Sequence, residues 1–188
     1  MTSSVPNDEK SKKKEISEKE VNEAQQAWCD GLVEISKAYR EDGDYKRLAD
    51  KFIDDLYDFA EGKVFFRPTL AAAPRNFRTT RAGARAYFIG DDPVNFPDDE
   101  GFAKKPWVHA RYDNAIEGSN AIQIHGNIAM TMGNVYLTPE VSTDGKEVVV
   151  DKVFAYRKDS EGKLRLIVHK SAVSNEPASD SEPDSNCQ

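Results

Sequence analysis

The sequence predicts an α+β fold in which N-terminal helices pack into a strongly curved antiparallel sheet, a cone-like barrel with an internal pocket. Apolar residues in the first part of the chain recur every three or four positions, which indicates amphipathic helices. After residue 106 the chain changes to extended runs of alternating character. Short turns containing glycine join these runs, and such turns favour antiparallel meanders over parallel βαβ units.

The first predicted element is a helix that begins at Ser17 or a neighbour and ends in the EDGD stretch at 41–44. Glycine inside a helix costs about 1 kcal/mol relative to alanine, so Gly31 is expected to mark a close packing contact. The apolar stripe of this helix consists of Val21, Ala24, Trp28, Leu32, Ile35 and Tyr39.

A second helix is predicted to follow, with Asp44 as its N-cap and Gly62 at its end. Its apolar stripe consists of Leu48, Phe52, Leu56 and Phe59.

The period then changes, and a short strand is expected at 64–67, a turn segment at 68–74 and a short helix at 81–89. Residues 90–106 hold three prolines and two glycines, which predicts a loop, in the manner of a flap over a site. Five further strands are predicted at 107–116, 121–125, 127–138, 147–158 and 163–173, with turns at 118–120, 144–146 and 160–162.

The composition divides the chain into three parts. Residues 1–17 are predicted to be a disordered tail, 18–173 a single α+β domain, and 174–188 a disordered acidic tail. The net charge is −7, and the one basic cluster, at 12–14, lies among acidic residues. This balance argues against a nucleic-acid partner.

The chain has no apolar run of membrane-spanning length and no signal-peptide pattern, which predicts a soluble protein without a membrane partner. Cys29 and Cys187 are not expected to meet, which favours a reducing compartment or a fold without disulfides. The compartment is left open between the cytoplasm and an organelle lumen reached after removal of a leader.

The last predicted strand carries the clearest candidate chemistry. Alternation places His169 and Ser171 on the same face, and histidine is the natural proton carrier near neutral pH. The alternative is that both residues lie at the margin of the sheet, without a catalytic role, and form hydrogen bonds with the backbone or with water. His169 and Ser171 share their predicted face with Arg165, Ile167 and Val173, and the opposite face holds Leu164, Leu166, Val168, Lys170 and Ala172.

Other candidate sites are weaker on the residues alone. The three histidines, His109, His125 and His169, fall on different predicted strands and lack the spacing of a zinc motif. Without further information, Thr69 can be interpreted as a residue whose hydroxyl stabilises a turn, and Tyr87 as a core residue whose phenol is hydrogen-bonded. No phosphate-binding glycine loop and no nucleophile elbow occur.

Five blocks in order resemble the iota-class carbonic anhydrases of algae and bacteria. They are FFRPTLA (65–71), FRTTRAGARAYFIG (77–90), GFAKKPW (101–107), IAMTMGNVYLT (128–138) and FAYRKDSEGKLRLIVHKSA (154–172). That family is similar to the nuclear-transport-factor and calcium/calmodulin-kinase association-domain superfamily, in which helices pack into a curved antiparallel sheet.

The resemblance implies a pocket in which carbon dioxide is hydrated to bicarbonate, in at least some members without a metal. Manganese or zinc remains the alternative cofactor. The family's polar pocket residues fall on Thr69, Tyr87, His169 and Ser171. We expect Thr69, Tyr87 and Ser171 to hold water and bicarbonate while His169 accepts or relays the proton. Tyr87 is the alternative base, provided that its pKa is depressed.

The chain departs from the family at one point, because it reads HKSA at 169–172 where the family has HHSS. The changed residues, Lys170 and Ala172, fall on the face opposite His169 and Ser171. Catalysis is expected to survive if that face is the outer side of the sheet. If both faces contribute, the chain is an inactive relative.

Two other classes of function stay open. A curved sheet with an apolar outer face predicts a homodimer. A non-catalytic association module would use an outer patch of Leu164, Leu166 and Val168 to form that dimer or recruit a partner. A pocket enzyme of another kind, such as a polyketide cyclase or ketosteroid-type isomerase, would need a buried acidic base. Asp113 and Glu117 are its nearest candidates, and both are expected to face solvent.

Overall fold

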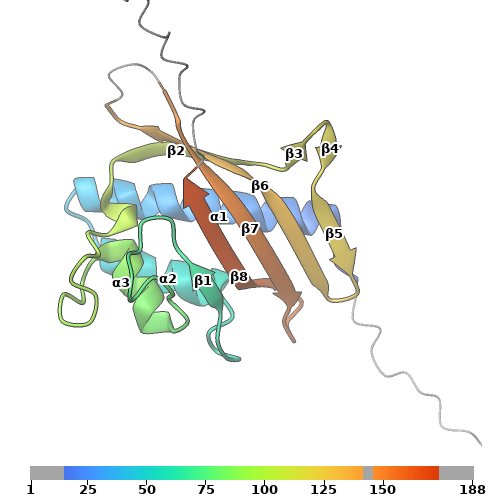
Figure 1. Ribbon diagram of the computed structural model, residues 1–188, viewed down its shortest axis with the longest axis horizontal. Helices are drawn as coiled ribbons and strands as arrows, with labels where there is room; N and C mark the ends of the chain where they lie inside the picture. Colours follow the sequence, from blue (N-terminus) through green and yellow to red (C-terminus); the bar gives the residue numbers. More distant parts are fainter. Residues whose placement is uncertain (1–14, 142–145, 174–188) are drawn as a thin grey trace, which may run out of the picture.

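The computed structural model describes residues 15–141 and 146–173. Both predicted disordered tails, except residues 15–17, and most of the turn predicted at 144–146 lie outside the described residues. Figure 1 shows the long first helix lying across the strands of the main sheet, with the two other helices beside one edge. The helices are α1 (Glu18–Arg40), α2 (Tyr45–Leu56) and α3 (Arg81–Ile89), and a 3-10 turn covers Phe102–Lys104.

The main sheet has the order β1-β8-β7-β6-β2, and β5 also pairs with β6 (Figure 1). The expected α+β class is confirmed, and the pairing is antiparallel except that β1 runs parallel to β8. The strands are β1 (Phe65–Arg67), β2 (Trp107–Asp113), β5 (Ile122–His125), β6 (Ile128–Pro139), β7 (Val148–Lys158) and β8 (Leu164–Val173). A separate hairpin joins β3 (Ala115–Ile116) to β4 (Ser119–Asn120) through Glu117 and Gly118, so its turn begins one residue before the predicted 118–120.

Helix α1 forms as predicted. Ser17 caps it, and the Glu20 side chain accepts a hydrogen bond from the Ser17 backbone in return. The expected close contact at Gly31 is confirmed, because a Cβ there would lie 2.5 Å from the Phe52 ring on α2. Tyr39, predicted to continue the apolar stripe, is 40% exposed. No helix in the described ranges is long and apolar enough to span a membrane.

Helix α2 begins after Asp44 as predicted, but its predicted end at Gly62 is wrong. The helix stops at Leu56, and Tyr57 adopts an extended backbone conformation. Tyr57 forms a bridge to Leu166 of β8, and the Asp58 backbone N–H donates to the Leu166 carbonyl. Pairing with β8 therefore replaces the last expected turn of the helix and brings Tyr57 against the sheet.

Strand β8 contains a bulge that simple alternation does not predict. Ala155 pairs with Val168 and Tyr156 with Leu166, which leaves Ile167 without a partner on β7. Leu166, assigned above to the outer face, is therefore 1% exposed and lies in the core. Beyond the bulge, His169 and Ser171 are both buried on the inner face, so their predicted sharing of a face is confirmed.

Candidate active site

Three polar side chains meet on the inner face of the sheet, His169 and Ser171 from β8 and Lys152 from β7. The Ser171 Oγ lies 2.9 Å from His169 Nε2, and Lys152 Nζ lies 2.8 Å from Ser171 Oγ and 3.0 Å from His169 Nε2. Lys152 faces Ser171 because the two residues are paired in the β7–β8 ladder. His169 and Ser171 are 1% exposed and Lys152 is 3% exposed. We call these three residues the polar triangle.

An aromatic wall surrounds the polar triangle. The His169 ring stacks on Phe66 at 4.3 Å between centroids and meets Phe154 edge-on at 4.8 Å. Trp28 on α1 lies edge-on to His169, and its Nε1–H donates to the Tyr57 hydroxyl at 2.9 Å. That hydroxyl lies 2.9 Å from His169 Nδ1. The imidazole is therefore fixed at both nitrogens.

Burial controls the protonation of the polar triangle. Burial lowers the pKa of His169 well below its usual range, and the nearby Lys152 lowers it further. The imidazole is therefore neutral near pH 7. Burial also lowers the pKa of Lys152 to about 7, and a smaller effect of Cys29 opposes it. No carboxylate in the described part of the chain forms an ion pair with Lys152.

Thr69 and Tyr87 form a second polar group beside the first. The Phe66 ring contacts both groups, at 5.6 Å from the Tyr87 ring and 4.3 Å from His169. The structure therefore brings the four predicted site residues together as two pairs in contact with one phenylalanine. No direct hydrogen bond joins the two pairs within residues 15–141 and 146–173.

Burial raises the pKa of Tyr87, although Leu70 and Thr69 lower it in part. Tyr87 is therefore a protonated phenol at neutral pH, and the condition under which it could act as the base is not met. The Thr69 hydroxyl lies near this phenol, but it is buried without a hydrogen bond of normal geometry to any described residue. A buried hydroxyl without a partner is rare and indicates a position for a ligand or water.

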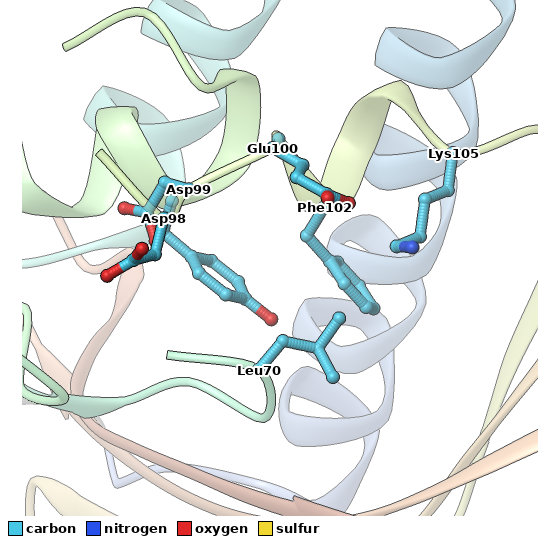
Figure 2. A pocket seen from close by; sticks show the side chains of 8 residues that line it. Leu70, Asp98, Asp99, Glu100, Phe102 and Lys105 are labelled. Carbon is cyan, nitrogen blue, oxygen red and sulfur yellow. The ribbon is translucent and has the colours of Figure 1, made fainter. Parts of the chain in front are cut away.

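A pocket of about 230 Å³ opens beside Tyr87. Figure 2 shows Leu70 and Phe102 on one side of it and the Asp98 and Asp99 side chains on the other. Glu100 and Lys105 complete its charged rim. The predicted loop at 90–106 therefore supplies most of this pocket. A buried ion pair between Asp99 and Arg78, at 2.8 Å, attaches the loop to the body of the protein.

The prediction from sequence missed Lys152, Tyr57 and Trp28 as members of the site. One available signal pointed to Lys152, because alternation along β7 puts it in phase with Val150, Phe154 and Tyr156, all of which are buried. The predicted second helix includes Tyr57, and Trp28 belongs to the predicted apolar stripe of the first helix, so neither pattern indicates a site.

The alternative sites gain little from the structure. His109 and His125 are exposed, and no group of three potential metal ligands occurs among the described side chains. Glu117 is exposed and Asp113 is half-buried, so neither is the buried acid that a cyclase or isomerase would need.

Comparison with known proteins identifies the relatives of this chain. The family model for metal-independent carbonic anhydrase matches residues 19–173. A metal-independent carbonic anhydrase from Nostoc sp. is 50% identical over 160 residues, which cover 84% of this chain and 74% of that protein. The crystal structure of an iota-carbonic anhydrase from a cyanobacterium, complexed with bicarbonate, superposes with a TM-score of 0.79 at 45% identity, covering 94% of this chain and all of that one.

A more distant structure shows the fold alone. An NTF2-like protein with a cystatin-like fold from Novosphingobium aromaticivorans superposes with a TM-score of 0.53 at 12% identity, covering 86% of this chain and 84% of that one.

Proposed function

The chain belongs to the family of metal-independent carbonic anhydrases, and we propose that it hydrates carbon dioxide reversibly to bicarbonate at the polar triangle and the adjoining Thr69–Tyr87 pair. The main support for these residues is the contact of His169 with Ser171 inside the aromatic wall. An apolar wall suits carbon dioxide, which has no net dipole. The bicarbonate bound to the cyanobacterial relative supports the same ligand here.

Without a metal, the site must activate water and stabilise the oxyanion through its own side chains. We propose that the hydroxyls of Thr69, Tyr87 and Ser171 hold water and bicarbonate by hydrogen bonds. The raised pKa of Tyr87 supports a role as hydrogen-bond donor. His169, neutral and fixed at both nitrogens, relays the proton.

The departure from the family motif at Lys170 and Ala172 is compatible with activity. Lys170 is exposed and Ala172 half-buried, whereas their neighbours His169 and Ser171 are buried. The side chains of the changed residues therefore lie on the outer side of the sheet, opposite those of the polar triangle. This supports an active enzyme over an inactive relative.

Stopped-flow measurement of carbon dioxide hydration tests the function. Protein treated with a strong chelator is expected to hydrate carbon dioxide well above the buffer rate, with no increase on addition of manganese or zinc. Activity seen only with added metal would remove the metal-free mechanism. A rate equal to that of buffer under all these conditions would leave only the association module.

Thr69→Val tests the role of the unpartnered hydroxyl. The free energy of unfolding is expected to stay constant or rise by up to about 1 kcal/mol, because an unsatisfied buried hydroxyl is removed without a change of shape. In contrast, kcat/KM for hydration is expected to fall about tenfold or more, because a hydrogen-bond donor to the oxyanion is lost. Thr79→Val, on the segment before α3, is the control. A Thr69→Val variant with the parent rate would remove Thr69 from the site.

We further propose that the chain forms a homodimer through the outer apolar face of the sheet. The apolar residues of this face are Phe65, Met130, Met132, Val153 and Val168, with the exposed Lys170 paired beside Val153, and Phe65 and Met132 are 66% and 55% exposed. The strand register sets Phe65 beside Val168 and Val153 beside Met132. Two copies of such a face can pack on each other around a twofold axis, because sheets stack face to face.

Met132→Glu is expected to convert the dimer into a monomer in sedimentation analysis, since it would bury two carboxylates at the centre of the interface. Val94→Glu is the matched control, because Val94 is 84% exposed on the 90–106 loop, away from the sheet. A parent protein that sediments as a monomer at all concentrations would contradict the proposed dimer.

A further inference from the structure

Lys152 is a buried amine, and no acidic side chain in residues 15–141 and 146–173 pairs with it. Among the described residues, its Nζ is hydrogen-bonded to two side-chain atoms, Ser171 Oγ and His169 Nε2, and it lies 4.5 Å from the centroid of the Trp28 ring. An aromatic face attracts an ammonium group, but much less strongly than a carboxylate does. Burying an ammonium without an anion is costly, so burial favours the neutral amine.

The ionisable groups that face Lys152 are themselves uncharged near neutral pH. His169 on β8 is neutral, and Tyr57 stands behind it. Cys29 on α1 has its pKa raised to about 12 by burial, and Tyr112 on β2 also to about 12. The Tyr112 hydroxyl donates to the Lys152 backbone carbonyl. None of these groups is an anion near neutral pH. An anion bound beside Lys152 would therefore be the charge partner of its ammonium form.

Building on the proposed function, we infer that Lys152 is the proton acceptor of carbon dioxide hydration and that its ammonium form is the counter-ion of the newly formed bicarbonate. The oxygen of the attacking water bonds to the carbon, and one C=O π pair moves onto oxygen. The proton lost by the water reaches the lone pair of Lys152 Nζ, directly or through the Ser171 hydroxyl. Carbon dioxide, water and an amine thus become bicarbonate and an ammonium group, with no net change of charge inside the core.

His169 responds to this change through its two fixed nitrogens. When Lys152 is neutral, the His169 Nε2–H can donate to the amine or to Ser171 Oγ while the Tyr57 hydroxyl donates to Nδ1. When Lys152 is an ammonium, it donates to Nε2, and the Nδ1–H donates to Tyr57. The contacts at 2.9 and 3.0 Å fit both arrangements. In both charge states of Lys152, one tautomer of His169 can therefore keep its hydrogen bonds to Lys152 and Tyr57.

The experiment measures the rate of carbon dioxide hydration by stopped flow across a pH series, for the parent protein, Lys152→Met and Lys163→Met. Lys163 is an exposed lysine just before β8, so Lys163→Met is the control. The parent and control rates are expected to rise with pH about tenfold per unit below about pH 7 and to level off above it, because only the neutral amine accepts a proton. Lys152→Met is expected to lose about 100-fold at the plateau together with the inflection near pH 7.

Nitrate, a planar anion that takes no proton, separates this role from a purely structural one. Its inhibition of the parent protein is expected to weaken about tenfold per pH unit above about pH 7, as Lys152 loses its charge. Lys152→Arg, which stays charged, is expected to bind nitrate without that weakening and to remain inactive. A folded Lys152→Met variant with the parent rate and inflection would overturn the inference and leave the carbonic anhydrase function standing. An inactive parent protein would instead overturn the function.

A titration of the parent protein keeps the inference testable if Lys152→Met fails to fold. In protein with carbon-13-labelled lysine, one Cε resonance is expected to titrate near pH 7 and the others near their usual value of about 10. A spectrum in which every lysine titrates above about pH 9 would contradict the role of Lys152.

Discussion

Ser171→Ala and His169→Ala are expected to lower kcat/KM for carbon dioxide hydration by about 100-fold or more while the protein stays folded. Ser171→Ala removes a single oxygen atom, the one that contacts both Lys152 Nζ and His169 Nε2. His169→Ala removes the relay and also disconnects the Tyr57 hydroxyl from the polar triangle. Initial rates by stopped flow, with circular dichroism to verify folding, measure both effects.

The two variants differ in what they leave behind. His169→Ala creates a cavity between Phe66, Phe154, Trp28 and Tyr57, which is expected to cost roughly 2–4 kcal/mol of folding free energy. Free imidazole has the shape of the missing ring, so adding it to the buffer is expected to restore part of the rate. Ser171→Ala leaves no space of that size and is expected to show no such rescue.

The exposed residues His125→Ala and Ser119→Ala are the matched controls, and both are expected to keep the parent rate. Parent-like rates in Ser171→Ala and His169→Ala would mean that the last strand is structural.

Lys152→Met is expected to raise the free energy of unfolding by roughly 2–4 kcal/mol at about pH 7, in the same variant that loses activity. The amine has a pKa of about 7 in the folded protein, against about 10.4 for an unfolded lysine. The folded state therefore excludes a proton that the unfolded state binds. Methionine has a similar length and carries no charge, and His169 and Ser171 keep their mutual contact.

The sign of this effect sets its pH dependence. Above about pH 10.4 both states hold a neutral amine, and Lys152 adds no penalty. As the pH falls from there toward about 7, the unfolded state gains the proton first and the parent protein loses stability. Below about pH 7 both states are protonated and the difference between parent and variant becomes constant.

This difference is measured by urea unfolding of the parent and Lys152→Met proteins at several pH values between about 7 and 9.5. The contributions of all other titratable groups cancel to first order in the difference. The gap in stability is expected to narrow as the pH rises. A gap that is independent of pH would mean that Lys152 has an ordinary pKa in the folded protein.

The sequence was sufficient to predict elements that depend on local patterns. The cap at Ser17, the close approach at Gly31 and the helix at 81–89 follow from spacing and from residue preference, and all three are confirmed. Two errors arose where contacts between distant segments override local preference. Tyr57 leaves the helix to pair with Leu166, and the bulge at Ile167 reverses the alternation of β8.

The candidate site was predictable only in part for the same reason. Alternation along the strand predicts that His169 and Ser171, which are close in sequence, share a face. The prediction that Thr69 and Tyr87 belong to the same site rests on the resemblance to a family. Lys152 was overlooked because a lysine within a strand is expected to face solvent. The unusual feature is that it alternates with apolar residues along β7, and its partner Ser171 is fixed by the register between β7 and β8, which sequence alone does not specify.

Oxygen-18 exchange between labelled carbon dioxide and water, followed by mass spectrometry at chemical equilibrium, tests the central claim most directly, because it observes the interconversion of carbon dioxide and bicarbonate itself. Chelator-treated parent protein is expected to deplete the label far faster than buffer, whereas Ser171→Ala and Lys152→Met are expected to approach the buffer rate. Depletion by the parent protein no faster than buffer would contradict a metal-free carbonic anhydrase. Equal depletion by the parent and both variants would contradict the site.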